Sequence, residues 1–418
     1  MKKRFITSSL KKSLSLFPAV LLNGARQVGK STLLSHLFKD HLFDHYFTLD
    51  DITTLTACKT DPIGFLNQFQ GKVAIDEIQR CPELLMTLKH TIDLNRQDSG
   101  RFLLTGSANL LSYPNVCESL AGRIDIIELE GLSAGEIFDK PYPSSFLKDL
   151  FSITDPIKLT QKWSHSLQNQ KTLTKTDLLN LIFYGGFPDV FLKQDEYFRS
   201  HWFQSYLTAY TERDVRDLNR MLDVVGFTKV FKLLCLQTGQ LININNLAVE
   251  SGLDQRTVSR YLEILSLTFQ LTILQPFSAN TRKRLVKTPK IYVNDSGYAS
   301  FFSGIDHLEN LLHNSAYGHL LETWVFSELR KLLHLETGID IFFYRTHLGK
   351  EIDFILTKGT RVIGIECKAS ESLQKQDFTG LKDLQSENPN ALGIILYGGQ
   401  TVLQVASQII AVPFSIFL

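Results

Sequence analysis

The residues best suited to chemistry form the octet Gly24-Ala25-Arg26-Gln27-Val28-Gly29-Lys30-Ser31. Its pattern, G-x-x-x-x-G-K-S, is that of a loop whose backbone N–H groups surround phosphate oxygens. The apolar run Pro18–Leu22 before it predicts a buried strand, and Thr32–Phe38 after it carries apolar residues at helical spacing. A helix that begins at the loop directs its positive end at phosphates, so this context favours a binding site over a chance octet. We expect ATP to bind the octet and Thr32, with Lys30 at the β- and γ-phosphates and the Ser31 hydroxyl as a ligand of Mg²⁺.

Two acidic residues end the next candidate strand, which begins at Lys72. In P-loop nucleotidases a strand-end aspartate completes the Mg²⁺ site, and this role suits Asp76. Glu77 is then placed to polarise the attacking water. The alternative is a strand that ends in two solvated acids, and the pairing with the glycine loop favours the catalytic interpretation.

Two further positions could contact the γ-phosphate of ATP. Ser107 or Asn109, after the candidate strand at Arg101–Gly106, could do so, or could equally cap a helix. Arg123 precedes another candidate strand, Ile124–Leu129. It could act as an arginine finger, in its own chain or toward a neighbouring copy, or it could serve in a structural ion pair.

Alternating strands and helices over residues 16–135 must position these groups. Phe43–Leu49 predicts a strand and Pro82–Leu94 a helix, while the basic residues 1–15 predict a short helix that docks on the core. This alternation indicates an α/β fold with a parallel sheet. Ligands of such sheets bind at the carboxyl ends of the strands, where the loop, Asp76 and Ser107 all fall.

A helix-turn-helix pattern follows within residues 226–300. Ile244–Ser251 predicts a helix that closes at Gly252, and Asp254 is a candidate N-cap for a second helix, Gln255–Leu267, whose Val258, Leu262 and Leu265 turn inward. Thr272–Leu274 and Lys290–Val293 predict two wing strands. The residues expected to contact DNA are Gln255, Arg256, Thr257, Ser259 and Arg260 on the second helix and Arg282, Lys283 and Arg284 at the wing tip. The alternative is a winged helix used only for protein packing.

The last third carries a second candidate active site. Asp353 lies on the predicted strand Glu351–Leu356, and Glu366-Cys367-Lys368 ends the strand that starts at Arg361. Across a hairpin, Asp353 and Glu366 could bind Mg²⁺ or Mn²⁺, which would activate water, while Lys368 offsets transition-state charge. The helix predicted at Gly318–Leu333 is expected to expose Glu322 as a third acid. Outward acids and lysines of an ordinary strand are the alternative.

The composition sets limits on other classes of function. The 418 residues are 44% hydrophobic and 21% charged with a formal net charge of +1, so any contact with nucleic acid must come from local patches. Five cysteines without a C-x-x-C pair indicate reduced thiols and a cytoplasmic protein. The basic start and the run Leu14–Leu22 resemble a signal peptide, but cleavage there would remove the strand that feeds the glycine loop. No apolar run approaches the roughly 18 residues of a membrane span.

Together these motifs resemble a prokaryotic family of uncharacterised AAA-type ATP-binding proteins. The resemblance covers nearly the whole chain and rests on the glycine loop, Ala74–Arg80, Leu104–Ser107, Ser119–Ser133, Tyr184–Pro188, Arg282–Lys290, Glu322, Glu351–Phe354 and Ile365–Ala369. It implies an AAA-like P-loop ATPase domain, placed at 1–140, and a winged helix, placed at 226–300. Between them, the Pro, Ser, Lys and Gln content of 141–170 predicts a connector, and Tyr184–Pro188 predicts a turn between helices, which gives a helical connector or lid over 141–225. It also implies a C-terminal α/β domain over 301–418, related to the PD-(D/E)XK nuclease fold, with Glu322, Asp353, Glu366 and Lys368 as its acids and lysine.

Two functions follow from this reading. The first is an ATP-hydrolysing enzyme that acts on DNA, with the C-terminal domain as a metal-dependent nuclease. The second is a nucleotide-controlled switch whose last two domains bind DNA or protein without cutting. The retained acids favour the first, and the neutral overall charge favours the second. AAA-like proteins often assemble, so a homo-oligomer is a further expectation, and nothing indicates a membrane role.

Overall fold

The computed structural model describes residues 2–95, 98–107, 122–168, 172–215, 223–278, 288–346 and 349–418. The chain forms two compact units, which are described separately. The first comprises residues 1–132 with the short later segments 209–222 and 263–270, and the second comprises the remainder. None of the helices within the described ranges is long and apolar enough to cross a bilayer.

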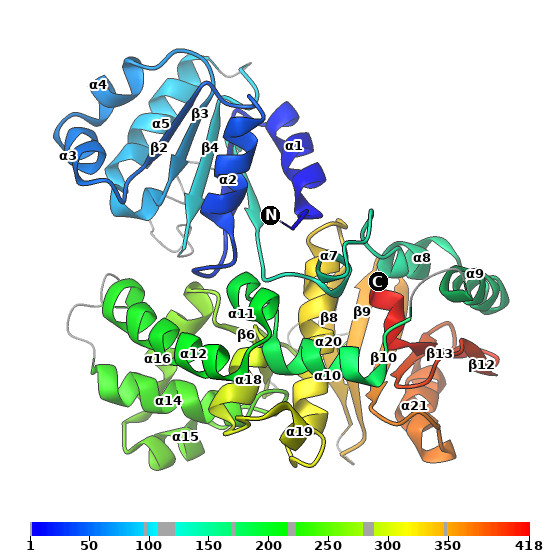
Figure 1. The fold of residues 1–418 in the computed structure, drawn as a ribbon. Helices are drawn as coiled ribbons and strands as arrows, with labels where there is room; N and C mark the ends of the chain where they lie inside the picture. Colours follow the sequence, from blue (N-terminus) through cyan, green and yellow to red (C-terminus); the bar gives the residue numbers. More distant parts are fainter. Residues whose placement is uncertain are drawn as a thin grey trace. The chain divides into compact units, whose positions relative to one another are not determined.

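The first unit is built on a five-stranded parallel sheet in the order β2-β3-β4-β1-β5 (Figure 1). Its strands are β1 (Ala19–Asn23), β2 (His45–Thr48), β3 (Val73–Asp76), β4 (Phe102–Gly106) and β5 (Ile124–Glu128). Its helices are α1 (Ile6–Leu16), α2 (Lys30–Lys39), α3 (Ile52–Thr60), α4 (Pro62–Asn67) and α5 (Glu83–Leu94), with a 3-10 turn, η1 (Ile78–Arg80), after β3. The predicted α/β fold with a parallel sheet is confirmed for this unit.

The three inner strands of this sheet form the buried centre of the first unit. β1, β3 and β4 are buried along their whole length, and α3, α4 and α5 cover one sheet face around Leu21, Ile75 and Leu104. The predicted N-terminal helix is α1, which packs on β1 and buries Ile6, Leu10 and Leu14 at helical spacing.

The C-terminal part of the second unit is a six-stranded mixed sheet in the order β12-β13-β11-β10-β9-β8. Its strands are β8 (Asp340–Arg345), β9 (Glu351–Lys358), β10 (Arg361–Lys368), β11 (Leu392–Tyr397), β12 (Leu403–Ala406) and β13 (Ile409–Pro413). Two helices cover it: α20 (Tyr317–Leu333) stacks Phe326 on Phe354, and α21 (Thr379–Glu387) packs Leu381 with Ile352. The pairing of β8 with β9 is irregular between the pairs Phe342–Ile355 and Tyr344–Ile352, and such a bulge interrupts the strict alternation of side chains along β9.

Helices fill the rest of the second unit. They are α7 (Ala134–Ile137), α8 (Phe146–Ser152), α9 (Pro156–Gln168), α10 (Lys175–Tyr184), α11 (Pro188–Lys193), α12 (Glu196–Tyr210), α14 (Val224–Leu236), α15 (Ile244–Ser251), α16 (Gln255–Leu267), α18 (Ser296–Phe302) and α19 (Leu308–Leu311). Between α16 and α18 lies an antiparallel pair, β6 (Leu271–Leu274) and β7 (Lys290–Val293). α12 and α16 each run into a segment grouped with the first unit.

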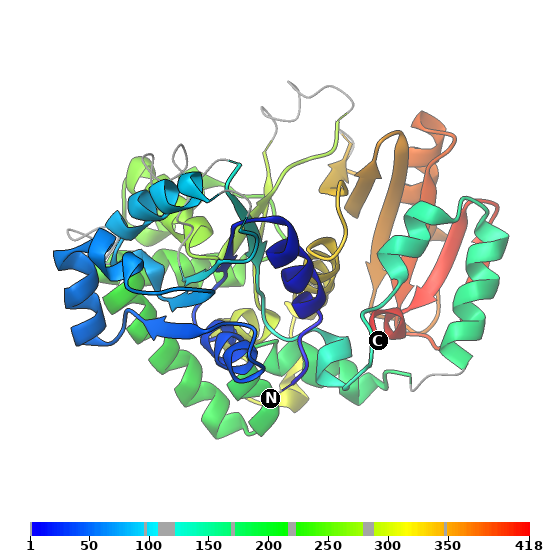
Figure 2. The same ribbon diagram turned by 90° about the horizontal axis from the view of Figure 1, so that it is seen from above.

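The segment predicted as a helical connector or lid, 141–225, contributes several helices to the second unit. Its first part contains α8 and α9, and α9 buries Leu159, Trp163 and Leu167 and packs on β12 and β13. Figure 2 draws these helices beside the last strands of the chain. The Phe146 ring also contacts the Phe417 ring, with centroids 5.8 Å apart. In its second part, α10 packs on α18 and α20 within the second unit. The turn predicted at Tyr184–Pro188 does join two helices, α10 and α11.

Candidate functional site

The glycine loop leaves β1 through backbone conformations that a side chain would disturb. Gly24 has φ +146°, and a Cβ added there would lie 2.1 Å from the carbonyl oxygen of Leu129. Gly29 has φ +101° and is the N-cap of α2, so the loop turns directly into the helix. The N–H groups at the start of α2 are therefore available to an anion, as the motif requires.

Lys30 is the buried cation of this loop. It is 5% exposed, and its Nζ donates to the carbonyl oxygens of Gly24 and Ala25, at 2.7 Å each. These two bonds fold the ammonium back across the loop that would hold a nucleotide. Phosphate oxygens can replace the two carbonyls as acceptors, so the loop fits a bound triphosphate.

Asp76 ends β3 at the same edge of the sheet. Register places Thr48 beside Asp76, and β4 and β1 end together at Gly106 and Asn23, where the glycine loop begins. Asp76 is 3% exposed, and its Oδ1 accepts a hydrogen bond from the buried hydroxyl of Thr105. The Tyr46 hydroxyl lies 3.4 Å from the Oδ2 atom. A buried carboxylate oriented by two hydroxyls suits a hard divalent cation such as Mg²⁺.

Glu77 adopts a left-handed conformation, with φ 61°. Gln79 connects it to β4, because Gln79 Nε2 donates to Glu77 Oε2 and to the Ser107 hydroxyl, the latter at 2.9 Å. The Thr105 hydroxyl also accepts from the Glu77 amide at 3.2 Å. Burial raises the pKa of Glu77 above its ordinary value, and Lys30 opposes this rise. The geometry thus brings together the loop, Asp76, Glu77 and Ser107, all of which had been predicted to meet.

Arg4 ties the same loop to the segment after β5. Its Nη1 donates to the Val28 carbonyl at 2.8 Å, and its Nη2 donates to the carbonyls of Glu130 and Gly131 at 2.6 and 3.2 Å. The side chain is 6% exposed. Sequence reasoning noted only that residues 1–15 are basic, because no local pattern reveals a contact that spans 126 positions.

The interpretation of Arg123 as a finger within its own chain is corrected by the strand register. Ile124, the next residue, pairs with Ala19 at the start of β1, whereas the loop follows Asn23 at the other end. Five residues of strand, roughly 16 Å, separate the two edges. Arg123 instead pairs with Asp93, with Nε 2.8 Å and Nη2 3.0 Å from the two carboxylate oxygens. The structural ion pair fits this geometry, and action on a neighbouring copy stays a prediction.

The helix-turn-helix residues fold as two helices joined by a short turn. α15 ends at Gly252 in a left-handed conformation, φ 76°, and the Asp254 carboxylate accepts from the amides of Arg256 and Thr257 at 2.9 and 3.0 Å. On α16, Val258, Leu262 and Leu265 are buried. The predicted DNA-contact residues Gln255, Arg256, Ser259 and Arg260 are exposed, while Thr257 is half-buried.

Two of these DNA predictions have further outcomes. The Thr257 hydroxyl donates to Asp254 at 2.6 Å, so it supports the turn. Arg282, Lys283 and Arg284 lie outside the described residues, as does Asn109. The two predicted wing strands correspond to β6 and β7, which pair with each other in antiparallel register.

In the second unit, Asp353 and Glu366 lie on the neighbouring antiparallel strands β9 and β10. Asp353 Oδ2 accepts from the Cys367 amide at 2.7 Å, and Lys368 Nζ donates to Glu366 Oε1 at 2.8 Å. Burial and the Glu322 charge raise the pKa of Asp353 to about 7. Burial and the Asp353 charge raise the pKa of Glu366 to about 8. Among the described residues, Glu366 Oε2 is buried without a hydrogen-bond partner. The hairpin does place the two predicted carboxylates together.

Glu322 differs from its prediction, because it is buried on α20 and not exposed. Its Oε1 accepts from Lys290 Nζ at 2.9 Å and from the Tyr292 hydroxyl. Lys290 Nζ also contacts Glu351 Oε1. Burial raises the pKa of Glu322, and Lys290 opposes this rise. Lys290 had been assigned only to a wing strand, so the sequence did not reveal it as a member of this cluster.

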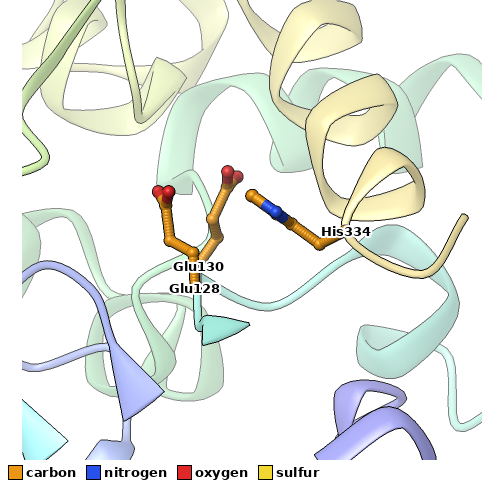
Figure 3. Close-up of side chains that lie close together, drawn as sticks. All are labelled: Glu128, Glu130 and His334. Atoms are coloured by element: carbon orange, nitrogen blue, oxygen red, sulfur yellow. The ribbon is translucent and has the colours of Figure 1, made fainter. Parts of the chain in front are cut away.

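The three acids do not form a three-ligand metal site as they stand. Within the described part of the second unit, no three carboxylate, imidazole or thiol groups bring ligand atoms within 4.8 Å of one another. Figure 3 shows Glu128 and Glu130 at the end of β5 and His334 just after α20. Glu128 and Glu130 belong to the first unit and His334 to the second. Of the predicted set, Asp353 and Glu366 lie on the adjacent strands β9 and β10, while Glu322 contacts Lys290, and metal binding by these residues stays a prediction.

Comparison with known families assigns types to three parts of the chain. Residues 16–138 match a family described as AAA domain. Residues 175–309 match Domain of unknown function (DUF8612), and residues 317–417 match Domain of unknown function (DUF4143). The N-terminal segment is therefore an AAA-type, ATPase-like domain, which supports ATP binding and hydrolysis.

Similar chains occur in bacteria and archaea. An uncharacterized protein of Mycobacterium tuberculosis is 28% identical over 415 residues, which cover 99% of this chain and 84% of that protein. One from Mycobacterium bovis gives the same values. An uncharacterized protein of Methanocaldococcus jannaschii is 23% identical over 411 residues, 91% of this chain and 82% of that one. The similarity extends over nearly the whole of this chain, beyond the AAA domain alone.

Solved structures give weaker matches. A Thermotoga maritima RuvB variant aligns with TM-score 0.29 and 19% identity over 64% of this chain and 88% of that one. The Bacillus subtilis DNA clamp loader delta protein aligns with TM-score 0.26 and 13% identity over 78% and 98%.

Proposed function

We propose that this protein binds ATP with Mg²⁺ at Gly24–Ser31, hydrolyses it, and uses the nucleotide cycle to act on DNA. The observation that carries the proposal is the meeting of the glycine loop, Asp76, Glu77 and Ser107 at one edge of the parallel sheet. An AAA domain match over residues 16–138 agrees with it. These groups follow three different strands: the glycine loop follows β1, Asp76 ends β3 with Glu77 directly after it, and Ser107 follows β4. Their meeting is therefore more specific than any one motif.

Each residue of this edge has a distinct role in the proposed reaction. Lys30 leaves the carbonyls of Gly24 and Ala25 and contacts the β- and γ-phosphates, while the loop amides hold their oxygens. Ser31 and Asp76 hold Mg²⁺, which when bound neutralises charge on the phosphates. Glu77 accepts the proton of the attacking water, and Gln79 holds its carboxylate toward Ser107. Ser107 is positioned to contact the γ-phosphate.

Nucleotide binding and turnover test the ATP site directly. Lys30→Ala should lose most of its ATP affinity and all measurable hydrolysis, because the buried cation at the phosphates is gone. Lys39→Ala removes an exposed lysine at the end of the same helix and should behave as wild type. Unchanged hydrolysis in Lys30→Ala would show that ATP is turned over elsewhere.

The finer part of the proposal is DNA binding through a winged helix made of α14, α15, α16 and the β6–β7 pair. α16 supports it because Gln255, Arg256, Ser259 and Arg260 are exposed on one helix while its opposite side is buried. The turn that presents this helix is fixed by Gly252 and Asp254. Arginine, glutamine and serine side chains suit base edges and phosphates.

Salt dependence of DNA affinity tests this interface. Arg256→Ala and Arg260→Ala should each weaken binding and lower the slope of log K against log salt by about one, if each contacts a phosphate. Glu263→Ala, an exposed residue of the same helix, should not lower the slope. If wild type does not bind DNA at low salt, this part of the proposal is wrong, and the helices serve in packing against protein instead.

A second candidate function is metal-dependent DNA cleavage by the C-terminal domain. One observation favours it: the buried, unpartnered Glu366 Oε2 lies on the strand beside Asp353, and an oxygen pair of this kind suits Mg²⁺ or Mn²⁺. The residues fit a metal through Asp353 and Glu366, which would hold it, with Lys368 beside them. Bound metal would supply an activated water.

Cleavage of labelled duplex and single-stranded DNA with Mg²⁺ or Mn²⁺, with and without ATP, tests this second candidate. Cleavage by wild type that is lost in Asp353→Ala supports a nuclease, and a requirement for ATP would link the two sites. Equal cleavage by both proteins would reveal a contaminant. No cleavage by either, with ATP hydrolysis intact, favours a nucleotide-controlled switch whose C-terminal domain binds without cutting.

A further inference from the structure

Lys290 is a buried lysine inside the acidic cluster of the second unit. Its side chain is 2% exposed, and its Nζ contacts Glu322 Oε1 at 2.9 Å and the Oε1 of Glu351. We propose that the ammonium of Lys290 is the resident cation of this cluster, and that Glu322 is its partner and not a metal ligand. The inference deepens the second candidate function and rests on it for the identity of the remaining ligands, Asp353 and Glu366.

The surroundings of Lys290 hold it in place. The Tyr292 hydroxyl, two residues along β7, donates to the same Glu322 Oε1 that accepts from Lys290. The Tyr292 ring stacks on Phe326 of α20, with centroids 4.3 Å apart, and lies 5.8 Å from Phe354 of β9. Lys290 Nζ also lies 5.6 Å from the centre of the Phe343 ring. β7, α20, β8 and β9 are thereby packed around one ammonium.

Charge explains why this position suits lysine. Carboxylates buried without a cation are costly, and a divalent ion or an ammonium can each offset them. Lys290 offsets Glu322 from α20 and Glu351 from β9 at once. Because the Lys290 side chain is only 2% exposed, its ammonium is buried against Glu322 Oε1, where a metal ion would otherwise bind.

The metal-ligand geometry agrees with this assignment. A divalent ion held by Glu322, Asp353 and Glu366 needs three converging oxygens, and no such convergence exists in the described part of this unit. Asp353 and Glu366 have other hydrogen-bond partners: the Cys367 amide donates to Asp353 at 2.7 Å, and Lys368 Nζ donates to Glu366 at 2.8 Å. Within the cluster, Lys290 therefore binds Glu322 and Glu351, whereas Lys368 binds Glu366.

Binding of Mn²⁺ alone, followed by electron paramagnetic resonance without nucleotide or DNA, tests the inference. Glu322→Gln should lower the Mn²⁺ affinity only slightly, through the loss of one nearby negative charge, whereas Asp353→Asn removes a ligand and should lower any affinity that wild type has much further. Lys290→Met should bind Mn²⁺ at least about tenfold more tightly, because a positive charge leaves the cluster. When Glu322→Gln is added to the Lys290→Met variant, it should weaken Mn²⁺ binding. Lys290→Arg keeps the charge and should match wild type.

Two results would overturn the inference. One is a Glu322→Gln variant that binds Mn²⁺ as weakly as Asp353→Asn, since Glu322 would then be a ligand. The other is a folded Lys290→Met variant with unchanged Mn²⁺ affinity. Thermal unfolding of each variant identifies misfolding, and if Lys290→Met does not fold, the Glu322→Gln comparison decides alone. Because the readout is metal binding, a protein that never cuts DNA can still satisfy or refute the inference.

Discussion

Arg4 donates from Nη1 to the backbone carbonyl of Val28 at 2.8 Å, so a residue that precedes α1 holds the middle of the glycine loop. The same guanidinium donates to Glu130 and Gly131 after β5. Three carbonyls from two segments thus accept from one planar guanidinium. The Leu129 backbone, next to Glu130, lies so close to Gly24 that position 24 cannot carry a side chain. The loop is shaped from outside its own motif.

Replacing Arg4 should therefore loosen ATP binding without removing the chemistry. We expect Arg4→Ala to raise the KM for ATP by roughly tenfold, the equivalent of about 1.4 kcal/mol, with a smaller change in kcat. Arg4→Lys should recover part of the loss, since lysine keeps the charge but not the planar donor. Steady-state ATPase assays measure both constants. Lys12→Ala, an exposed residue of α1, is the matched control, and an unchanged KM in Arg4→Ala would refute the positioning role.

The raised pKa of Glu77 gives the ATPase a defined pH response. A general base acts when deprotonated, and burial raises the pKa at which Glu77 takes up its proton. As pH falls, kcat should therefore decline at a higher pH than an ordinary glutamate would give. Glu77→Gln should retain ATP binding, hydrolyse at least about a hundredfold more slowly, and lose this pH dependence. A Glu77→Gln variant with normal turnover would place the base elsewhere.

Arg123 should be dispensable for catalysis within one chain. It lies at the amino end of β5 and pairs with Asp93, whereas ATP is expected at the carboxyl end of the sheet. In dilute, monomeric protein, Arg123→Ala should hydrolyse ATP at the wild-type rate. If hydrolysis by wild type rises with protein concentration and that rise is lost in Arg123→Ala, the arginine acts on a neighbouring copy. Sedimentation alongside the assays would establish which state is measured.

How much the sequence could predict depends on the range of the contacts involved. The glycine loop, Asp76 and Glu77 were predictable because each motif is local and strand order in parallel sheets brings their ends together. Arg4 and Lys290 were not, because each acts through residues more than twenty positions away. Glu322 was misjudged as exposed, although Leu320, Leu321, Trp324 and Val325 surround it with apolar residues on both sides of the helix.

The segment predicted as a connector contains a helical periodicity that its composition does not reveal. Its Pro, Ser, Lys and Gln content suggested a linker, yet Leu159, Trp163 and Leu167 recur every four residues and α9 buries all three. Periodicity was the better guide there than composition. The wing tip at 282–284 and Asn109 lie outside the described residues, so their roles stay predictions.

Arg199 allows the stability of the second unit to be tested apart from the ATP site. Its guanidinium is wholly buried and donates to the carbonyls of Phe183, Gly297 and Ile305 and to the Ser300 hydroxyl, at 2.6 to 3.2 Å. Its carbon Cζ also lies 3.7 Å from the centre of the Phe183 ring. Burial lowers the pKa of this arginine to about 10. Arg199→Met leaves these acceptors unpaired and should lower the free energy of unfolding of this unit by about 3 kcal/mol.

Urea unfolding followed by tryptophan fluorescence measures this loss, since Trp163, Trp202 and Trp324 all lie in the second unit. His201→Ala, which changes an exposed residue of the same helix, α12, should unfold at the same urea concentration as wild type. Below the transition, ATP affinity of Arg199→Met should stay at the wild-type value, because every residue proposed to bind ATP belongs to the first unit. A parallel loss of ATP affinity and stability would instead show that the two units fold as one, and the ATP site would then depend on the packing around α18.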